Sequence, residues 1–62
     1  MNQEELRKQV KIVKALNDDI YYKDFAMYLN INENSFYNWL NGYYSLSKKN
    51  IKLLQDIIID LI

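Results

Sequence analysis

Hydrophobic side chains recur at spacings of three and four residues along most of the chain, and short polar stretches interrupt them. The pattern is clearest in residues 22–42, where two such runs are joined by the turn Asn30-Ile31-Asn32. Its apolar positions are Phe25, Ala26, Leu29, Ile31, Phe36, Trp39 and Leu40. These spacings predict two short helices. The small side chain of Ala26 is expected to let the second helix cross close over the first.

The residues before this segment predict one longer helix over residues 4–16. Its expected buried stripe comprises Leu6, Val10, Val13 and Leu16. The basic residues Arg7, Lys8 and Lys11 fall on the other face, where we expect them to be solvated. Ile20 is expected to anchor the following loop in the core.

Polar residues with capping chemistry separate the predicted helices. Either Asp18 or Asp19 is expected to cap the second helix, which runs from about Ile20 or Tyr22 to Leu29. Left-handed backbone at Asn30 would end it. The third helix is predicted from Glu33 to about Leu40 or Asn41. The expected capping or terminating residues after Asn30 are Asn32, Gly42 and Ser47.

The last predicted helix, residues 48–61, is more apolar than one buried stripe requires. On a helical wheel its apolar residues cover roughly a 180° arc. Such a surface predicts a dimer interface, because large exposed apolar patches are association sites. The interface residues expected are Leu53, Ile57, Ile58, Leu61 and Ile62. The alternative is a wide core contact in a very small domain, with an apolar tail that frays.

Composition favours helices throughout. The chain of 62 residues has no proline and one glycine, and 50% of its residues are hydrophobic. We therefore expect a single all-α domain over residues 1–62, a bundle of four to five helices with a central helix-turn-helix at residues 22–42. The chain has no cysteine and no histidine, which excludes disulfides, thiol nucleophiles and the usual zinc sites. We expect no enzyme activity, no metal or other cofactor and no small-molecule substrate.

The distribution of charge and apolar residues bears on location and partners. No apolar run approaches the roughly 18 residues of a membrane helix, so we expect a cytoplasmic protein without membrane contact. Formal net charge is zero, which is unusual for a domain that meets a polyanion. Residues 17–46 are acidic, with Lys23 as their one cation.

The central segment resembles the lambda-repressor-like, Cro/repressor-type helix-turn-helix domains of phage and bacterial transcription regulators. The resemblance is carried by FAxxLxI, then FxxWLNG, then a leucine and a capped last helix, and covers about Ile20 to Ile58. It implies that residues 33–41 enter the major groove of double-stranded DNA as a recognition helix. Two positions depart from the family pattern: Asn30 stands where glycine is common, and Tyr22 where a phosphate-binding glutamine is common.

The resemblance assigns contacts to particular residues. Asparagine amides bond adenine, a carboxylate accepts from cytosine, and a tyrosine ring packs on the thymine methyl group, which favours an A·T-rich site. The expected base contacts are Asn32, Glu33, Asn34, Tyr37, Asn38 and Asn41. The expected phosphate contacts are Lys23, Tyr43, Tyr44, Ser45, Lys48 and Lys49. Purely structural roles remain open: Asn32 as a cap, Glu33 as a helix-dipole partner, Asn41 as a helix end, and the six tyrosines as cover for the core.

Two functions compete. The first is a sequence-specific DNA-binding regulator that acts as a homodimer. The second is an adaptor, antirepressor or inhibitor that keeps the fold but binds a protein through Tyr43, Tyr44 and the last helix. Zero net charge and the acidic middle segment favour this alternative.

Overall fold

The computed structural model describes residues 2–61, and within them it contains four α-helices and no strand. The helices are α1 (Gln3–Leu16), α2 (Tyr22–Tyr28), α3 (Glu33–Leu40) and α4 (Lys48–Leu61). The predicted all-α class is therefore confirmed, and the number of helices is the lower of the two expected. In the described part of the chain, no helix combines the length and the apolar character needed to cross a membrane.

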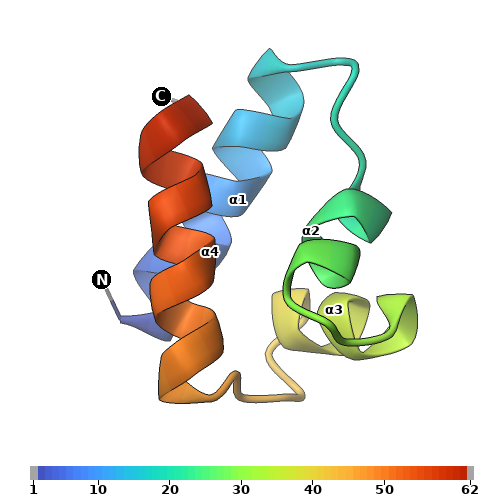
Figure 1. The fold of residues 1–62 in the computed structure, drawn as a ribbon, viewed down its shortest axis with the longest axis vertical. Coiled ribbons are helices and arrows are strands. Elements are labelled where there is room, and N and C mark those ends of the chain that lie inside the picture. Colours follow the sequence, from blue (N-terminus) through green and yellow to red (C-terminus); the bar gives the residue numbers. More distant parts are fainter. Residues whose placement is uncertain (1, 62) are drawn as a thin grey trace.

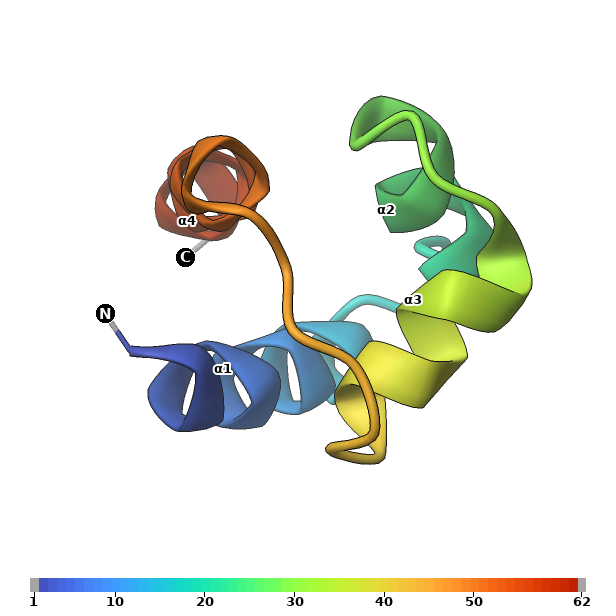
Figure 2. The same cartoon turned by 90° about the horizontal axis from the view of Figure 1, so that it is seen from below.

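The helices form two packed pairs. α1 lies beside α4, and α2 packs against α3 (Figure 1). The view turned by 90° shows the two pairs on opposite sides of the molecule, joined by the loop after α1 and by the loop between α3 and α4 (Figure 2). This arrangement leaves α2 and α4 facing each other across the molecule.

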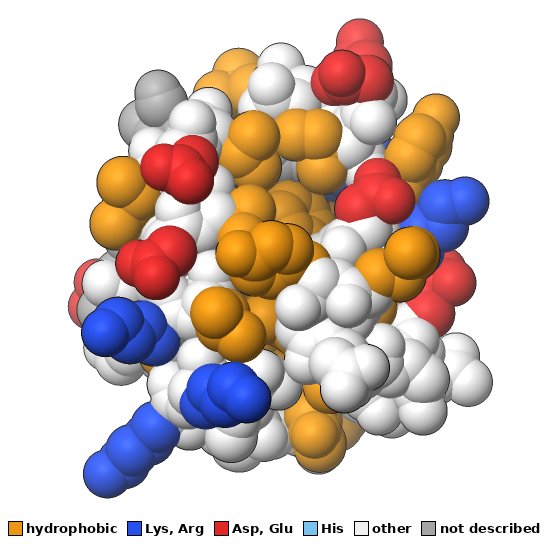
Figure 3. Space-filling model, in the orientation of Figure 1, with side chains coloured by type: hydrophobic (Ala, Val, Ile, Leu, Met, Phe, Trp, Pro, Cys, Tyr) orange, Lys and Arg blue, Asp and Glu red, His pale blue; other side chains and the backbone are white. Residues whose placement is uncertain are grey.

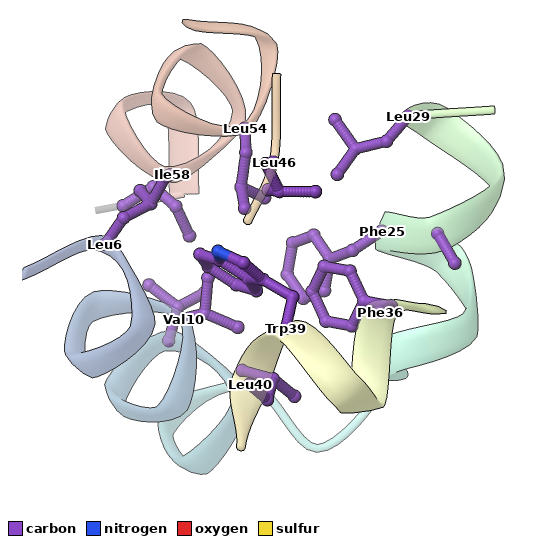
Figure 4. Close-up of a cluster of buried hydrophobic side chains, with 12 residues drawn as sticks. Leu6, Val10, Phe25, Leu29, Phe36, Trp39, Leu40, Leu46, Leu54 and Ile58 are labelled. Atoms are coloured by element: carbon purple, nitrogen blue, oxygen red, sulfur yellow. The ribbon is translucent and has the colours of Figure 1, made fainter. Parts of the chain in front are cut away.

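One hydrophobic core joins the two pairs, and Trp39 lies near its centre (Figure 4). Trp39 and Phe36 are both fully buried, with ring centroids 5.5 Å apart. Phe36 in turn stacks on Phe25 at 5.8 Å. The side chains of this core are Leu6, Val10, Val13, Phe25, Ala26, Leu29, Phe36, Trp39, Leu40, Leu46, Leu54 and Ile58.

The turn between α2 and α3 is closed by backbone hydrogen bonds. The N–H of Asn30 donates to the carbonyl of Met27 at 3.1 Å, and the N–H of Ile31 donates to that of Ala26 at 3.0 Å. This pair of bonds is a Schellman motif, which requires a left-handed residue. Asn30 supplies it with a φ of 59°, as predicted.

The predicted caps of the last two helices are confirmed. Asn32 accepts a hydrogen bond from the N–H of Ser35 at 2.7 Å, and Ser47 accepts one from Asn50 at 3.2 Å. Each bond pairs a backbone donor that the first turn of a helix leaves without a partner. The starts of α3 and α4 are thus fixed by local chemistry.

Two predictions for the first half of the chain are wrong. Leu16 is not buried: it is 78% exposed at the last position of α1, beyond the residues that pack on the core. Neither Asp18 nor Asp19 caps α2. The helix begins after Tyr21, whose N–H donates to the carboxylate of Asp24 at 3.1 Å. Asp24 lies inside α2, where it reaches back to the residue that precedes the helix.

Candidate functional site

α3 presents a continuous polar face to solvent because its apolar residues all turn toward the core. Phe36, Trp39 and Leu40 are buried, whereas the positions between them are exposed. The exposed residues at or beside this helix are Asn32, Glu33, Asn34, Tyr37, Asn38 and Asn41. These six are the residues expected to contact bases, and the structure brings them onto one helix and its two ends.

Two of the six have structural roles that limit what they offer a ligand. The side-chain oxygen of Asn32 is occupied by the capping bond to Ser35, so its amide N–H2 group is what remains. Asn41 is the C-cap of α3, and its N–H donates to the carbonyl of Tyr37 at 3.0 Å. Asn34 and Asn38, one helical turn apart, keep both the donor and the acceptor of their amides exposed.

Glu33 and Tyr37 form a polar pair on the same face. Partial burial of the ring, followed by the negative charge of Glu33 and a hydrogen bond to its carboxylate, raises the pKa of Tyr37 above its ordinary value. The ring of Tyr37 also meets the ring of Tyr22 edge-on, at 5.8 Å and 84°. Tyr37 is therefore a neutral phenol at physiological pH, and its ring is in edge-on contact with α2.

The chain leaves α3 through a second Schellman motif. The N–H of Gly42 donates to the backbone carbonyl of Trp39 at 3.0 Å, and the N–H of Tyr43 donates to the backbone carbonyl of Asn38 at 2.9 Å. Gly42 has a φ of +87°, the left-handed conformation expected from the sequence. The motif directs Tyr43 into solvent, where it is 84% exposed.

The first turns of α1 hold this loop in place. The guanidinium of Arg7 lies 5.3 Å from the ring centroid of Trp39 and donates hydrogen bonds to the carbonyls of Trp39 and Tyr44. The side-chain oxygen of Gln3 accepts from the indole N–H of Trp39 at 2.8 Å and from the N–H of Leu46 at 3.1 Å. We call these two residues the Gln3–Arg7 clasp.

The clasp corrects one expectation and adds a feature that sequence reasoning missed. Arg7 was expected on a solvated face, yet it is partly buried and committed to the α3–α4 loop. Its partners lie more than thirty positions away, and no local pattern in α1 signals them. Arg7 is thus a structural cation, not one available to a polyanion.

The residues expected to contact phosphate are all exposed, but they occupy two regions. Tyr43, Tyr44 and Ser45 lie in the loop that leads to Lys48 and Lys49 at the start of α4. Figure 1 shows this loop continuing from the end of α3 along one end of the molecule. The remaining candidate, Lys23, is not close to this loop or to the start of α4. Lys23 lies on α2, across the molecule from α4 and 5.7 Å from the ring of Tyr21.

The residues expected at a dimer interface are only partly available. The prediction that Ile58 lies at a dimer interface is wrong. Ile58 is fully buried and packs in the core against α1, so none of its surface is available to a second subunit. Ile62 lies outside the described residues. Leu53, Ile57 and Leu61 are half-buried at the edge of the core. The wide apolar arc of α4 therefore serves both the core and the surface.

Comparisons with known proteins add no relative. No protein-family model, no curated protein sequence and no solved structure gives a significant match to this chain. The candidate site consequently rests on its own geometry: a polar helix face, a fixed aromatic loop and two lysines at the next helix start.

Proposed function

We propose that the protein is a sequence-specific, double-stranded DNA-binding transcription regulator of the phage or mobile-element type, acting as a homodimer. The observation that carries this proposal is the pair α2 and α3. Two short helices meet at a tight turn through Asn30, and the second exposes a polar face. Such a pair has the form of a helix-turn-helix, whose second helix enters the major groove.

The exposed side chains of α3 have the chemistry to read bases. Asn34 and Asn38 each offer the paired donor and acceptor that match N7 and N6 of adenine. Tyr37 offers an apolar ring edge for a thymine methyl group, and Glu33 offers an acceptor for cytosine N4. The two free asparagines favour an A·T-rich half-site.

Phosphate contacts in this proposal come from the α3–α4 loop and the start of α4. Lys48 and Lys49 supply charge, Tyr43 is exposed, and the N-terminus of α4, which favours anions, begins at the same place in the chain. α3 itself carries no lysine or arginine. We therefore expect weak binding by one subunit and a salt dependence equivalent to only a few released counterions.

The test is selection from a randomised duplex library, followed by gel shift at low and moderate salt. The proposal predicts an enriched half-site. Asn38→Ala should lower affinity for that site about 5- to 150-fold, the effect of losing one bidentate base contact, while non-specific binding stays unchanged. Lys48→Ala should weaken all duplexes alike and reduce the salt slope by about one. Lys8→Ala, at an exposed position of α1, is the matched control. Failure to retain any duplex at low salt would refute the proposal.

A protein-binding adaptor, antirepressor or inhibitor is the second candidate. The 84% exposure of Tyr43 and the zero net charge of the chain favour it. A double change, Lys48→Glu with Lys49→Glu, separates the two functions. It should abolish duplex binding but leave a complex built on Tyr43 and Tyr44 largely intact.

A further inference from the structure

A hollow of about 230 Å³ opens between α2 and α4, the two facing helices that belong to different packed pairs. Its lining residues are Ile20, Asp24, Phe25, Tyr28, Ile57 and Leu61. Figure 3 shows hydrophobic side chains lining this depression in the middle of one face. We call it the α2–α4 trough. Its walls are apolar apart from Asp24, so its exposure to water carries a free-energy cost that a docked apolar surface would remove.

α4 forms a ridge along one side of the trough. Leu53, Ile57 and Leu61 follow its edge at spacings of four residues and are each half-buried. A ridge that runs beside a trough is self-complementary under two-fold symmetry, because the ridge of each copy can fill the trough of the other. The shape of this face therefore suits a second copy of the same chain.

Charge on the ridge is divided along its length. The first half of α4 carries Lys48, Lys49 and Lys52, and the second half carries Asp56 and Asp60, all exposed. Successive residues of a helix are rotated by about 100° around its axis, so Lys49, Asp56 and Asp60 lie within about 40° of one another around α4, beside Leu53. The outer flank of the ridge is thus basic at one end and acidic at the other.

The side of the trough formed by α2 is also acidic. Asp24 lines the trough from α2, opposite the second half of α4. In Figure 3, acidic side chains lie on both sides of the upper part of the depression, and lysines gather below, over the start of α4. The acidic end of the trough consequently matches a cationic, apolar helix, and the first half of α4 has that composition.

We propose that a second copy docks on this face with the two α4 helices antiparallel, each lying in the trough of the other. The proposal rests on the homodimer of the proposed function and defines its geometry. The two-fold axis passes between the two α4 helices, at a level midway between Leu53 and Ile57, so Leu53 lies opposite the partner's Ile57. Lys49 then lies within about one residue of the level of the partner's Asp60. A parallel arrangement would instead place like charges against each other.

Charge reversal tests this pairing without DNA. Lys49→Glu and Asp60→Lys should each weaken the dimer at least about tenfold in sedimentation equilibrium, since each creates two like-charge contacts. An equimolar mixture of the two variants should restore association as a heterodimer, because both contacts then join opposite charges. The double variant should restore it as well. Lys8→Glu on α1 is the control and should leave the dimer unchanged.

The outcomes separate clearly. Lys49 and Asp60 are exposed, and thermal unfolding followed by circular dichroism verifies that each variant folds. A monomeric parent protein, single variants that dimerise like the parent, or a mixture that fails to recover would each overturn the proposal. A monomeric parent that binds an amphipathic Lys/Leu helical peptide in the trough would assign this face to a foreign cationic helix. The association measurements contain no DNA, so they are independent of the duplex selection. A protein that dimerises but fails to bind duplex in that selection would refute the proposed function and leave this pairing intact.

Discussion

The Gln3–Arg7 clasp is expected to contribute substantially to the free energy of unfolding. One oxygen of Gln3 serves two donors, the indole N–H of Trp39 and the backbone N–H of Leu46. Trp39 is fully buried and Leu46 is 5% exposed, so neither residue has ready access to water. Gln3→Ala removes the shared acceptor and leaves two donors without a partner.

The magnitude follows from the cost of a buried donor left unpaired, about 1–3 kcal/mol each. Gln3 itself is half-buried, and water recovers part of that cost. We expect Gln3→Ala to lower the free energy of unfolding by about 2–4 kcal/mol. The whole free energy of unfolding of a chain of this length is about 3–9 kcal/mol. The melting temperature should therefore fall by at least about 8 °C.

Urea unfolding at neutral pH, followed by circular dichroism and Trp39 fluorescence, measures the effect. Gln3→Glu keeps an oxygen in place and should retain most of the stability, since a carboxylate accepts both bonds. Gln9→Ala, the same change on the same helix, should cost less than about 1 kcal/mol. A Gln3→Ala protein within about 0.5 kcal/mol of the parent, or a Gln3→Glu protein as unstable as Gln3→Ala, would refute the role of the clasp.

Predictions at three further sites test the geometry of α2 and α3. Ala26→Leu should destabilise the protein by about 1–3 kcal/mol, because Ala26 is 2% exposed where the two helices pack, whereas Met27→Leu, at a 75% exposed position, should be nearly neutral in thermal unfolding. Asn30→Val should cost about 1–2 kcal/mol at its φ of 59°, and Asn30→Gly should match or exceed the parent in urea unfolding. Ultraviolet titration should place the phenolate transition of Tyr37 above that of an ordinary tyrosine, and Glu33→Gln should lower it; a transition unmoved by that change would contradict the pairing. The folded protein holds this proton more tightly than the unfolded chain, so stability from Tyr37 should decline as pH rises above about 10.

The second half of the fold was predictable because its signals are local. Asn30, Asn32, Gly42 and Ser47 each act on backbone groups within a few residues, so the sequence alone locates the ends of α3 and the start of α4. The exposed face of α3 follows from the same periodicity, since burial of Trp39 and its neighbours fixes the opposite side.

Features that depend on distant parts of the chain were not predictable. Leu16 fits the buried stripe of α1, but periodicity records the direction of a side chain and not how far the neighbouring helix extends. Asp24 replaces the expected Asp18 or Asp19 because the chain runs extended through Tyr21 before α2 begins. Arg7 acquires its role only when α3 ends beside α1.

Residues on α4 show the same limit. The wheel of this helix marks a wide apolar arc but does not divide it between core and surface. The structure assigns Ile58 to the core and leaves Leu53, Ile57 and Leu61 at its edge. The trough beside them depends on where α2 lies, and the sequence of α4 contains no information about that.

An amide-detected NMR titration with the selected duplex determines whether the polar face of α3 contacts DNA, as we propose. We expect the largest shifts at low salt on the backbone of α3, on the side-chain amides of Asn34 and Asn38, and on the loop through Tyr43. The lysines of α1 at Lys8 and Lys11 should remain unaffected. Shifts confined to α1, or no shifts at duplex concentrations that saturate gel-shift binding, would contradict this proposal.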